Sequence, residues 1–178
     1  LREGMVQDIE DIDAVINQFL DFARITGEQS AASELDLNEL VNSVVDRYQR
    51  QGKSIATRLG SVPRLPMKAL AIQRLLTNLL DNALHHGGTG VEVETAAADG
   101  RVRLSVRDRG PGIPAAEAER MLQPFTRLNE ARSTSGSGLG LAIVDRIAKM
   151  HGGNVSLLAR DGSGLEARVE LPITQAKN

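Results

Sequence analysis

The sequence predicts an α+β fold in which helices form one layer over a mixed, largely antiparallel sheet, giving a two-layer α/β sandwich. Segments with helical spacing of apolar residues are interspersed with short runs in which every second residue is apolar, such as residues 91–95 and 102–107. Asp99-Gly100 lies between these two runs and predicts a tight hairpin. Ahead of this domain, residues 1–25 carry an apolar stripe that predicts one additional helix.

Composition and charge narrow the classes of function. The 178 residues include no cysteine, which excludes disulfides and thiolate metal sites. The net charge is −2 and aromatic residues make up only 2% of the chain, so we expect no nucleic-acid partner. No run approaches 18 consecutive apolar residues and the opening does not form a signal peptide, so we expect no membrane contact in this part of the protein.

The N-terminal stripe repeats at intervals of four and three residues. It consists of Met5, Ile9, Ile12, Ile16, Phe19 and Ala23. A period near 3.5 residues places these side chains along one narrow seam, which is typical of a helix that packs lengthwise on another helix. The alternative is a core helix of the domain that follows. Residues 26–35 combine turn-forming residues with no apolar period and predict a linker.

The main domain is expected over residues 36–173, with residues 174–178 as a tail. Its first helix begins with a sequence that resembles a capping box, Asp36-Leu37-Asn38-Glu39, and ends at Gly52. The other predicted elements are a strand over 54–59, a helix over 68–86, the hairpin over 91–107, a short helical piece after Pro114, a helix over 139–151 and a final hairpin over 154–171.

Two segments are rich in glycine, residues 108–113 (Asp-Arg-Gly-Pro-Gly-Ile) and 136–141 (Gly-Ser-Gly-Leu-Gly-Leu). Glycines at alternate positions let the backbone approach a ligand closely, and its N–H groups then cradle an anion. The second segment runs directly into a predicted helix, whose N-terminus favours phosphate. No Gly-Lys-Ser/Thr is present, which excludes a P-loop, and neither segment follows the first strand of a βαβ unit, as a Rossmann fingerprint requires. The alternative is that these glycines only mark turns.

Asn78 and Asn82 lie four residues apart on the predicted helix over 68–86, so both amides share one face, displaced from the leucine face. Asparagine is a poor helix former, and two on one face favour a polar role such as an oxygen ligand for Mg²⁺. Without the glycine segments, two solvated side chains would be the simpler interpretation.

Four motifs, in this order, resemble those of bacterial sensor histidine kinases. Residues 78–83 (Asn-Leu-Leu-Asp-Asn-Ala) resemble the N box, 108–112 the first glycine box, 123–127 (Gln-Pro-Phe-Thr-Arg) the F box and 136–141 the second glycine box. The chain is thereby identified as a member of the wider gyrase, chaperone, kinase and mismatch-repair ATPase superfamily, whose domain has the Bergerat fold. Residues 123–150 look most similar to the branch of the osmosensor EnvZ.

The resemblance implies ATP and Mg²⁺ as cofactors and a mobile lid over ATP at residues 126–137. It implies that Asn82 coordinates the metal ion, with Asn78 as a nearby phosphate or metal contact, and that Asp108 accepts a hydrogen bond from the adenine amino group. Arg127 and Arg132 are implied as partners of the γ-phosphate. The other cofactor-binding positions that it implies are His85, His86, Gly110, Gly112, Ile113, Phe125, Thr126, Gly136, Ser137, Gly138, Leu139, Gly140 and Leu141.

The sequence departs from the family at His85 and His86, where many members carry Lys or Arg and then an aromatic residue. Neither these histidines nor His151, whose simplest interpretation is a helix cap, is followed by the acidic residue, arginine and proline that mark a phosphoacceptor. The resemblance therefore implies that the phosphoacceptor lies on a first bundle helix outside this chain, and that residues 1–25 are the second helix of that dimerisation bundle.

The resemblance implies a protein-histidine kinase that transfers the γ-phosphate of ATP to a bundle histidine, for relay to an aspartate of a response-regulator receiver domain. It also implies a homodimer through the bundle, and a cytoplasmic domain of a parent protein in the inner membrane. Asn78 stands where the hydrolysing branches carry a glutamate that activates water, and an amide cannot accept that proton. Two alternatives remain: a nucleotide-binding scaffold without turnover, and a serine kinase or anti-sigma factor of the same fold.

Overall fold

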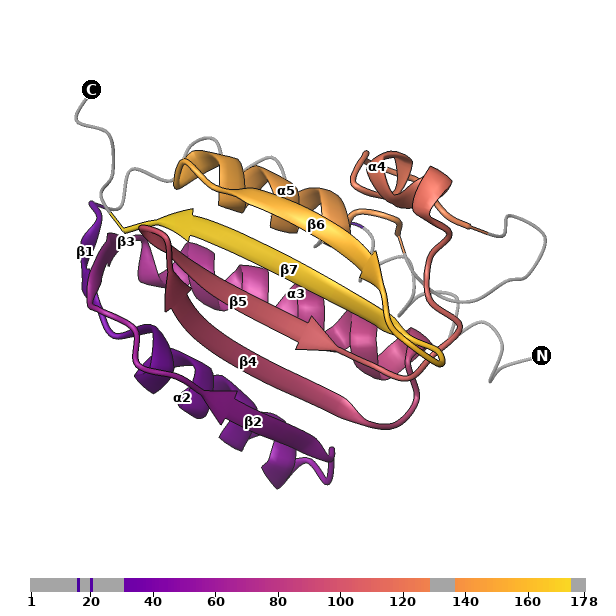
Figure 1. Cartoon of the computed structure of the whole chain (residues 1–178), viewed down its shortest axis with the longest axis horizontal. Helices are drawn as coiled ribbons and strands as arrows, with labels where there is room; N and C mark the ends of the chain where they lie inside the picture. Colours follow the sequence, from indigo (N-terminus) through magenta and orange to yellow (C-terminus); the bar gives the residue numbers. More distant parts are fainter. Residues whose placement is uncertain (1–15, 17–19, 21–30, 129–136, 174–178) are drawn as a thin grey trace.

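The structure, a computed structural model, describes residues 16, 20, 31–128 and 137–173, which form two layers (Figure 1). One layer is a twisted sheet, and the other consists of helices that cover one of its faces. The predicted α+β sandwich is confirmed.

The main sheet has five strands in the order β2-β4-β5-β7-β6. Their bounds are β2 (Ile55–Leu59), β4 (Val91–Ala98), β5 (Arg101–Arg107), β6 (Asn154–Ala159) and β7 (Leu165–Pro172). β2 runs parallel to β4, and every other neighbouring pair is antiparallel. The hairpin between β4 and β5 turns at Asp99 and Gly100, whose positive φ angles of 52° and 72° suit a two-residue turn.

The helical layer consists of α2 (Leu37–Arg50), α3 (Ala69–His86) and α5 (Gly140–Met150), with α3 between the other two (Figure 1). The short piece predicted after Pro114 is the 3-10 turn η1 (Ala115–Glu117) followed by α4 (Ala118–Met121), which contacts β6. Asp36 caps α2, because its Oδ1 accepts the N–H of Glu39 at 3.1 Å, as the sequence predicts.

The hydrophobic core lies between α3 and the sheet. Apolar residues recur along α3 at helical spacing, and at most 1% of each is exposed: Ile72, Leu75, Leu76, Leu79 and Leu80. Full burial of one such side chain stabilises the fold by roughly 1.5–3 kcal/mol. This packing fixes the rotation of α3 about its axis, so its polar residues face away from the sheet.

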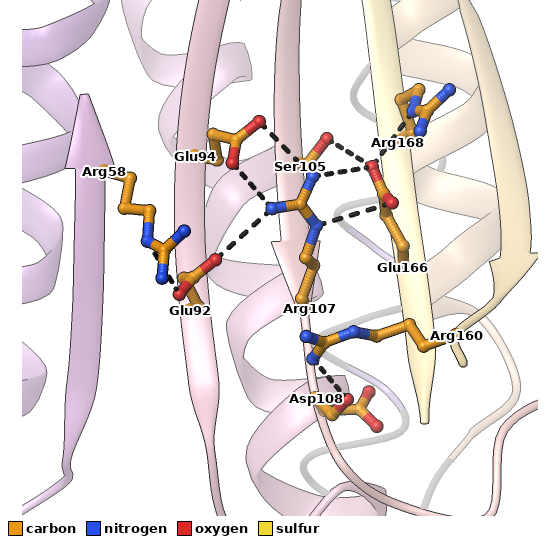
Figure 2. Close-up of polar contacts among 9 residues, drawn as sticks. All are labelled: Arg58, Glu92, Glu94, Ser105, Arg107, Asp108, Arg160, Glu166 and Arg168. Atoms are coloured by element: carbon orange, nitrogen blue, oxygen red, sulfur yellow. Dashed lines mark hydrogen bonds and ion pairs between the residues drawn. The ribbon is translucent and has the colours of Figure 1, made fainter. Parts of the chain in front are cut away.

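The face of the sheet turned away from the helices carries a network of ion pairs (Figure 2). Arg107 donates to Glu94 at 2.6 Å, and its Nε lies 3.4 Å from Glu166. Burial alone would raise the pKa of Glu166, but hydrogen bonds from Arg168, Ser105 and Arg107 outweigh burial and lower this pKa to about 2. Oppositely charged side chains on neighbouring strands thus form ion pairs across this face of the sheet.

One short element differs from the prediction. Residues 33–35 belong to the expected linker, but β1 (Ser33–Leu35) pairs antiparallel with β3 (Leu65–Met67). Strands of three residues are too short to show an alternating pattern, and this pair depends on burial of Leu65 and Met67, each 2% exposed. The predicted bundle helix and C-terminal tail lie outside the described residues, except that Ile16 and Leu20 are helical and exposed. Within the described ranges, no helix is long and apolar enough to cross a bilayer.

Candidate functional site

A cavity of about 670 Å³ opens between α3, the end of β5 and the segments that lead into α4 and α5. This volume is typical of sites that hold a small molecule or cofactor. The predicted site residues that line it are Asn78, Asn82, His85, His86, Asp108, Gly112, Ile113, Thr126, Arg127, Ser137, Gly138, Gly140 and Leu141. The fold therefore brings together residues from all four motifs.

Three predicted site residues are described but do not line the cavity. A side chain at Gly110 would meet the backbone of His86, so this glycine allows a close approach of two segments behind the cavity. Phe125 is 63% exposed, whereas Leu139 is fully buried in the core. The predicted residues that lie outside the described ranges are Arg132 and Gly136.

One wall of the cavity is the polar face of α3, which presents Asn78, Asp81 and Asn82. The Asn78 amide nitrogen donates to the Arg74 carbonyl at 2.9 Å. The side-chain oxygen of Asn78 lies beside the start of α5, since a methyl group at Gly140 would come within 3.3 Å of it. The wall thus offers amide and carboxylate oxygens to the cavity.

Asp108 follows β5 at the other end of the cavity and is 5% exposed. Its Oδ1 accepts the N–H of Gly110 at 2.8 Å and the N–H of Leu165 at 3.3 Å. Among the described residues no hydrogen bond occupies Oδ2, so this oxygen remains for a donor in the cavity. Gly87 allows Asp108 to pack against the end of α3, because any side chain at position 87 would overlap the Asp108 carboxylate.

The turn between β6 and β7 holds the first glycine segment in place. Arg160 donates to the Asp108 carbonyl at 2.8 Å, as Figure 2 shows, and the Ser163 hydroxyl donates to the Gly110 carbonyl. Gly164 packs directly on the Asp108 carbonyl, where no side chain fits. The backbone and the carboxylate of Asp108 are thus both fixed before any ligand binds.

The second glycine segment opens α5 beside α3. Ser137 and Gly138 line the cavity, and the Gly138 carbonyl accepts the N–H of Phe125 at 3.0 Å, which ties the F-box segment to this turn. The N–H of Leu139 donates to the Ser137 hydroxyl at 3.2 Å. In this structure the Ser137 hydroxyl therefore binds the backbone N–H of Leu139, one of the positions that the resemblance assigns to the cofactor.

Two adjacent histidines end α3 at the rim of the cavity. The rings of His85 and His86 meet edge to face, with centroids 4.6 Å apart. Burial, followed by the neighbouring His85, lowers the pKa of His86 below its usual value. His86 is therefore neutral near pH 7 and presents an aromatic surface rather than a charge.

Several cavity residues were not predicted as site residues. They are Tyr48, Gln51, Lys53, Asp81, Leu84, Pro111, Met121, Leu128 and Leu165. Of these, Asp81 and Pro111 lie within the N box and the first glycine box, and the others lie outside the motifs. Asp81 carried the best available signal, because it shares the helical face of Asn78 and Asn82. Tyr48 and Lys53 reach the cavity through the packing of α2 on α3, which no local pattern reveals.

The side-chain oxygens on the polar face of α3 suit a hard divalent cation as ligands, because Mg²⁺ prefers amide, carboxylate and water oxygens. Asn82 supplies an amide, with the Asp81 carboxylate one residue away. Among the described residues, no group of three or more His, Cys, Asp or Glu side chains gathers to hold a metal. A cation at Asn82 would therefore depend on oxygens of a bound ligand and of water for most of its coordination shell.

Fold and cavity together define a nucleotide-binding domain of the Bergerat type. Residues 67–175 match the family described as histidine kinase-, DNA gyrase B-, and HSP90-like ATPase, which is more than half of the chain. The chain belongs to this family. Its relatives identify it further as the ATPase domain of a bacterial sensor histidine kinase. It is 36% identical over 138 residues to sensor histidine kinase component HK1 of Mycobacterium tuberculosis, a match that covers 78% of this chain and 82% of that protein.

Solved structures agree with this assignment. The histidine kinase domain of the Escherichia coli osmosensor EnvZ is 32% identical, with a TM-score of 0.65 over 85% of this chain and 95% of that domain. Full-length ShkA in complex with AMPPNP is 29% identical, with a TM-score of 0.79 over 98% of this chain and 39% of that protein. The chain spans only 28% to 43% of the lengths of the first curated relatives that it matches.

Proposed function

We propose that the cavity binds Mg-ATP and that the chain is the catalytic part of a protein-histidine kinase. The γ-phosphate passes to a histidine on a helical bundle, and from there to an aspartate of a response-regulator receiver domain. The observation that carries the proposal is that the amide face of α3, the Asp108 carboxylate and the glycine segment before α5 meet in one cavity. Family membership supports it, as does the binding of the ATP analogue AMPPNP by the related ShkA.

The base of the nucleotide is assigned to the end of the cavity at Asp108. Asp108 Oδ2, to which no described residue donates, accepts a hydrogen bond from the adenine amino group, whereas guanine carries a carbonyl oxygen at that position and would leave the carboxylate opposed to an acceptor. Ile113 and Leu165 supply apolar contacts, and the neutral ring of His86 lies at the same end.

The phosphates are assigned to the end of the cavity at Asn78 and Asn82. The N-terminus of α5 faces this region, so its backbone N–H groups and helix dipole favour a bound anion. Arg127 lines the same cavity and supplies positive charge. Mg²⁺, when bound at Asn82, would neutralise part of the phosphate charge.

The polar groups of the cavity favour phosphate transfer to a partner over hydrolysis. Asn78 cannot accept a proton from water. The two carboxylates of the cavity already accept hydrogen bonds. Asp81 accepts one from the Tyr48 hydroxyl at 2.5 Å, and Asp108 accepts two from backbone N–H groups. In the proposed reaction a histidine nitrogen attacks the γ-phosphorus in line and ADP leaves.

The assembly and location of the whole protein are also proposals. Sensor kinases among the relatives support a parent protein in the bacterial inner membrane, with this domain in the cytoplasm. In it, residues 1–25 would form the second helix of a bundle that joins two subunits, and residues 26–35 would link it to the ATP-binding domain.

Asn82→Ala should abolish binding of Mg-ATP, or transfer from it, because a hard cation loses an amide oxygen ligand. Titration calorimetry with ATP, in the presence and absence of Mg²⁺, measures this directly. Asn154→Ala is the matched control. Asn154 is exposed and lies far from the cavity, and among the described contacts its side chain bonds only Arg101. Wild-type affinity in Asn82→Ala, with Mg²⁺ present, would contradict the assigned role.

Transfer is tested by mixing the chain with a separate bundle protein that carries a phosphoacceptor histidine and with ATP labelled at the γ-phosphate. We expect label on the bundle protein that is lost in acid, as phosphohistidine is. Acid-stable label would favour the serine kinase alternative. Tight ATP binding without any transfer would favour the scaffold.

A further inference from the structure

The cavity has a wall that the family motifs do not supply. Tyr48, Gln51 and Lys53 line it from the end of α2 and the turn that follows. This wall flanks α3 on the side of Asp81, whereas the start of α5 flanks α3 on the side of Asn78. The polar face of α3 therefore has neighbours on both sides, one of which carries an ammonium group.

The turn after α2 holds the backbone of Lys53 in one position. The N–H of Lys53 donates to the Tyr48 carbonyl at 3.1 Å, and the N–H of Gly52 donates to the Gln49 carbonyl at 2.9 Å. These two bonds, with Gly52 at a φ of +80°, form a Schellman motif. The Gln49 side chain closes the turn from the other side by donating to the Ile55 carbonyl at 2.9 Å.

Tyr48 also fixes this turn to α3. Its hydroxyl donates to Asp81 Oδ1 at 2.5 Å, across 33 residues of sequence. Burial first, and then the Asp81 carboxylate, raise the pKa of Tyr48 above its usual value, so the hydroxyl keeps its proton and remains a donor. Tyr48 thus holds the backbone of Lys53 through its carbonyl and binds Asp81 through its hydroxyl, so the turn that carries Lys53 is fixed to α3.

Charge in the cavity indicates what Lys53 does. Among the described residues that line the cavity, Lys53 is the only lysine and Arg127 the only arginine. Within the same described part of the chain, the Lys53 ammonium makes no hydrogen bond or ion pair. The Asp81 carboxylate already has the Tyr48 hydroxyl as a donor. A nucleoside triphosphate brings about four negative charges, and phosphate oxygens are strong acceptors for an ammonium group.

We propose that Lys53 binds the terminal phosphates of the nucleotide, and that Tyr48 is its positioning residue. This inference rests on the proposed function of the cavity. Lys53 supplies, from the end of α2, a positive charge at the phosphate end of the polar face of α3. At the rim of this face the chain carries His85, where many sensor kinases have Lys or Arg.

The test compares ATP, ADP and AMP as ligands of wild type and Lys53→Met by titration calorimetry in Mg²⁺ buffer. We expect Lys53→Met to weaken ATP binding roughly tenfold and AMP binding by less than about twofold, because a charge-assisted bond to the terminal phosphates is lost. Lys53→Arg should restore ATP affinity to within about threefold. The control is Lys149→Met, whose ammonium pairs with Asp145 on α5 outside the cavity.

Equal ATP affinity in wild type and Lys53→Met would overturn the inference and leave the proposed function intact. A loss shared equally by ATP and AMP would also overturn it. If wild type binds none of the three nucleotides, the proposed function itself fails, and the inference fails with it.

The positioning role of Tyr48 is tested with Tyr48→Phe, which keeps the ring and removes the hydroxyl. If Tyr48 acts through Lys53, Tyr48→Phe weakens ATP binding in wild type and has no further effect in the Lys53→Met background. A Tyr48 that only supports the fold would lower the melting temperature without this dependence on Lys53. Additive losses of ATP affinity would contradict the positioning role.

Discussion

At the scale of single residues, His151 shows how one imidazole joins two helices. The N–H of Lys68, at the N-terminus of α3, donates to His151 Nε2 at 3.1 Å, and His151 Nδ1 donates to the Ile147 carbonyl at 2.8 Å. These two bonds require a neutral ring with its proton on Nδ1. Burial is the main cause that lowers the pKa of His151 below 6.5. His151, at the C-terminal end of α5, thus caps the N-terminus of α3, the helix that carries Asn78 and Asn82.

The stability of the domain should therefore fall in mild acid. Below pH 6.5 the unfolded chain protonates His151 while the folded chain does not, so the free energy of unfolding decreases as the pH falls towards the folded pKa. The slope contributed by this group is at most about 1.4 kcal/mol per pH unit, and it vanishes well above pH 6.5. Chemical denaturation between pH 5 and 8 measures it.

His151→Gln removes the titrating group and should reduce that slope, although the variant is less stable than wild type at pH 8 because the two bonds are disturbed. Part of the slope should remain, since the pKa of His86 is lowered as well. An unchanged slope in His151→Gln would contradict the account of this residue.

At the scale of elements, the β6–β7 turn and the first glycine segment act as one unit. Arg160 and Ser163 donate to carbonyls of Asp108 and Gly110, and the N–H of Leu165 binds the Asp108 carboxylate. The unit depends on Gly164, which is buried against the Asp108 carbonyl. The side chain assigned to adenine is therefore positioned by a hairpin more than 50 residues further along the chain.

Gly164→Ala should weaken both the fold and the binding of adenine nucleotides, because the added methyl group overlaps the Asp108 carbonyl. Gly162→Ala is a close control: both glycines have positive φ, 86° and 115°, but a methyl group at 162 meets nothing within 4 Å. We expect a loss of about 1 kcal/mol in unfolding free energy for Gly162→Ala, and roughly 2–4 kcal/mol for Gly164→Ala. Thermal and denaturant unfolding, with AMP titrations, compare them. Equal effects of the two substitutions would contradict the close-approach argument.

At the scale of the whole molecule, local patterns predicted most of the fold. The helical spacing of Leu70, Leu75, Leu76, Leu79, Leu80 and Ala83 predicted α3, although Leu70 was expected to face inward and is 61% exposed. Asp99-Gly100 predicted the hairpin between β4 and β5. These signals are strong because each depends on residues close in sequence. The pair β1 and β3 was missed, since two strands of three residues become stable only when they pair across 30 residues of chain.

The candidate site likewise contains residues that local motifs predicted and residues that they did not. The motifs predicted Asn78, Asn82 and Asp108, and the cavity contains all three. Sequence reasoning missed Tyr48 and Lys53, because their place in the cavity depends on how α2 packs against α3. Asp108 itself was predicted, but the contacts that hold it come from the β6–β7 turn. The sequence pattern predicted this turn only as part of a hairpin, not its contact with Asp108.

The central claim is that ATP binds between the amide face of α3 and the glycine segment before α5. A crystal structure of the chain with AMPPNP and Mg²⁺ tests it most directly. We predict adenine within hydrogen-bond distance of Asp108 Oδ2, and phosphates between Asn82 and the N-terminus of α5. Nucleotide bound elsewhere, or this cavity empty at a concentration of AMPPNP that saturates binding in solution, would contradict the account.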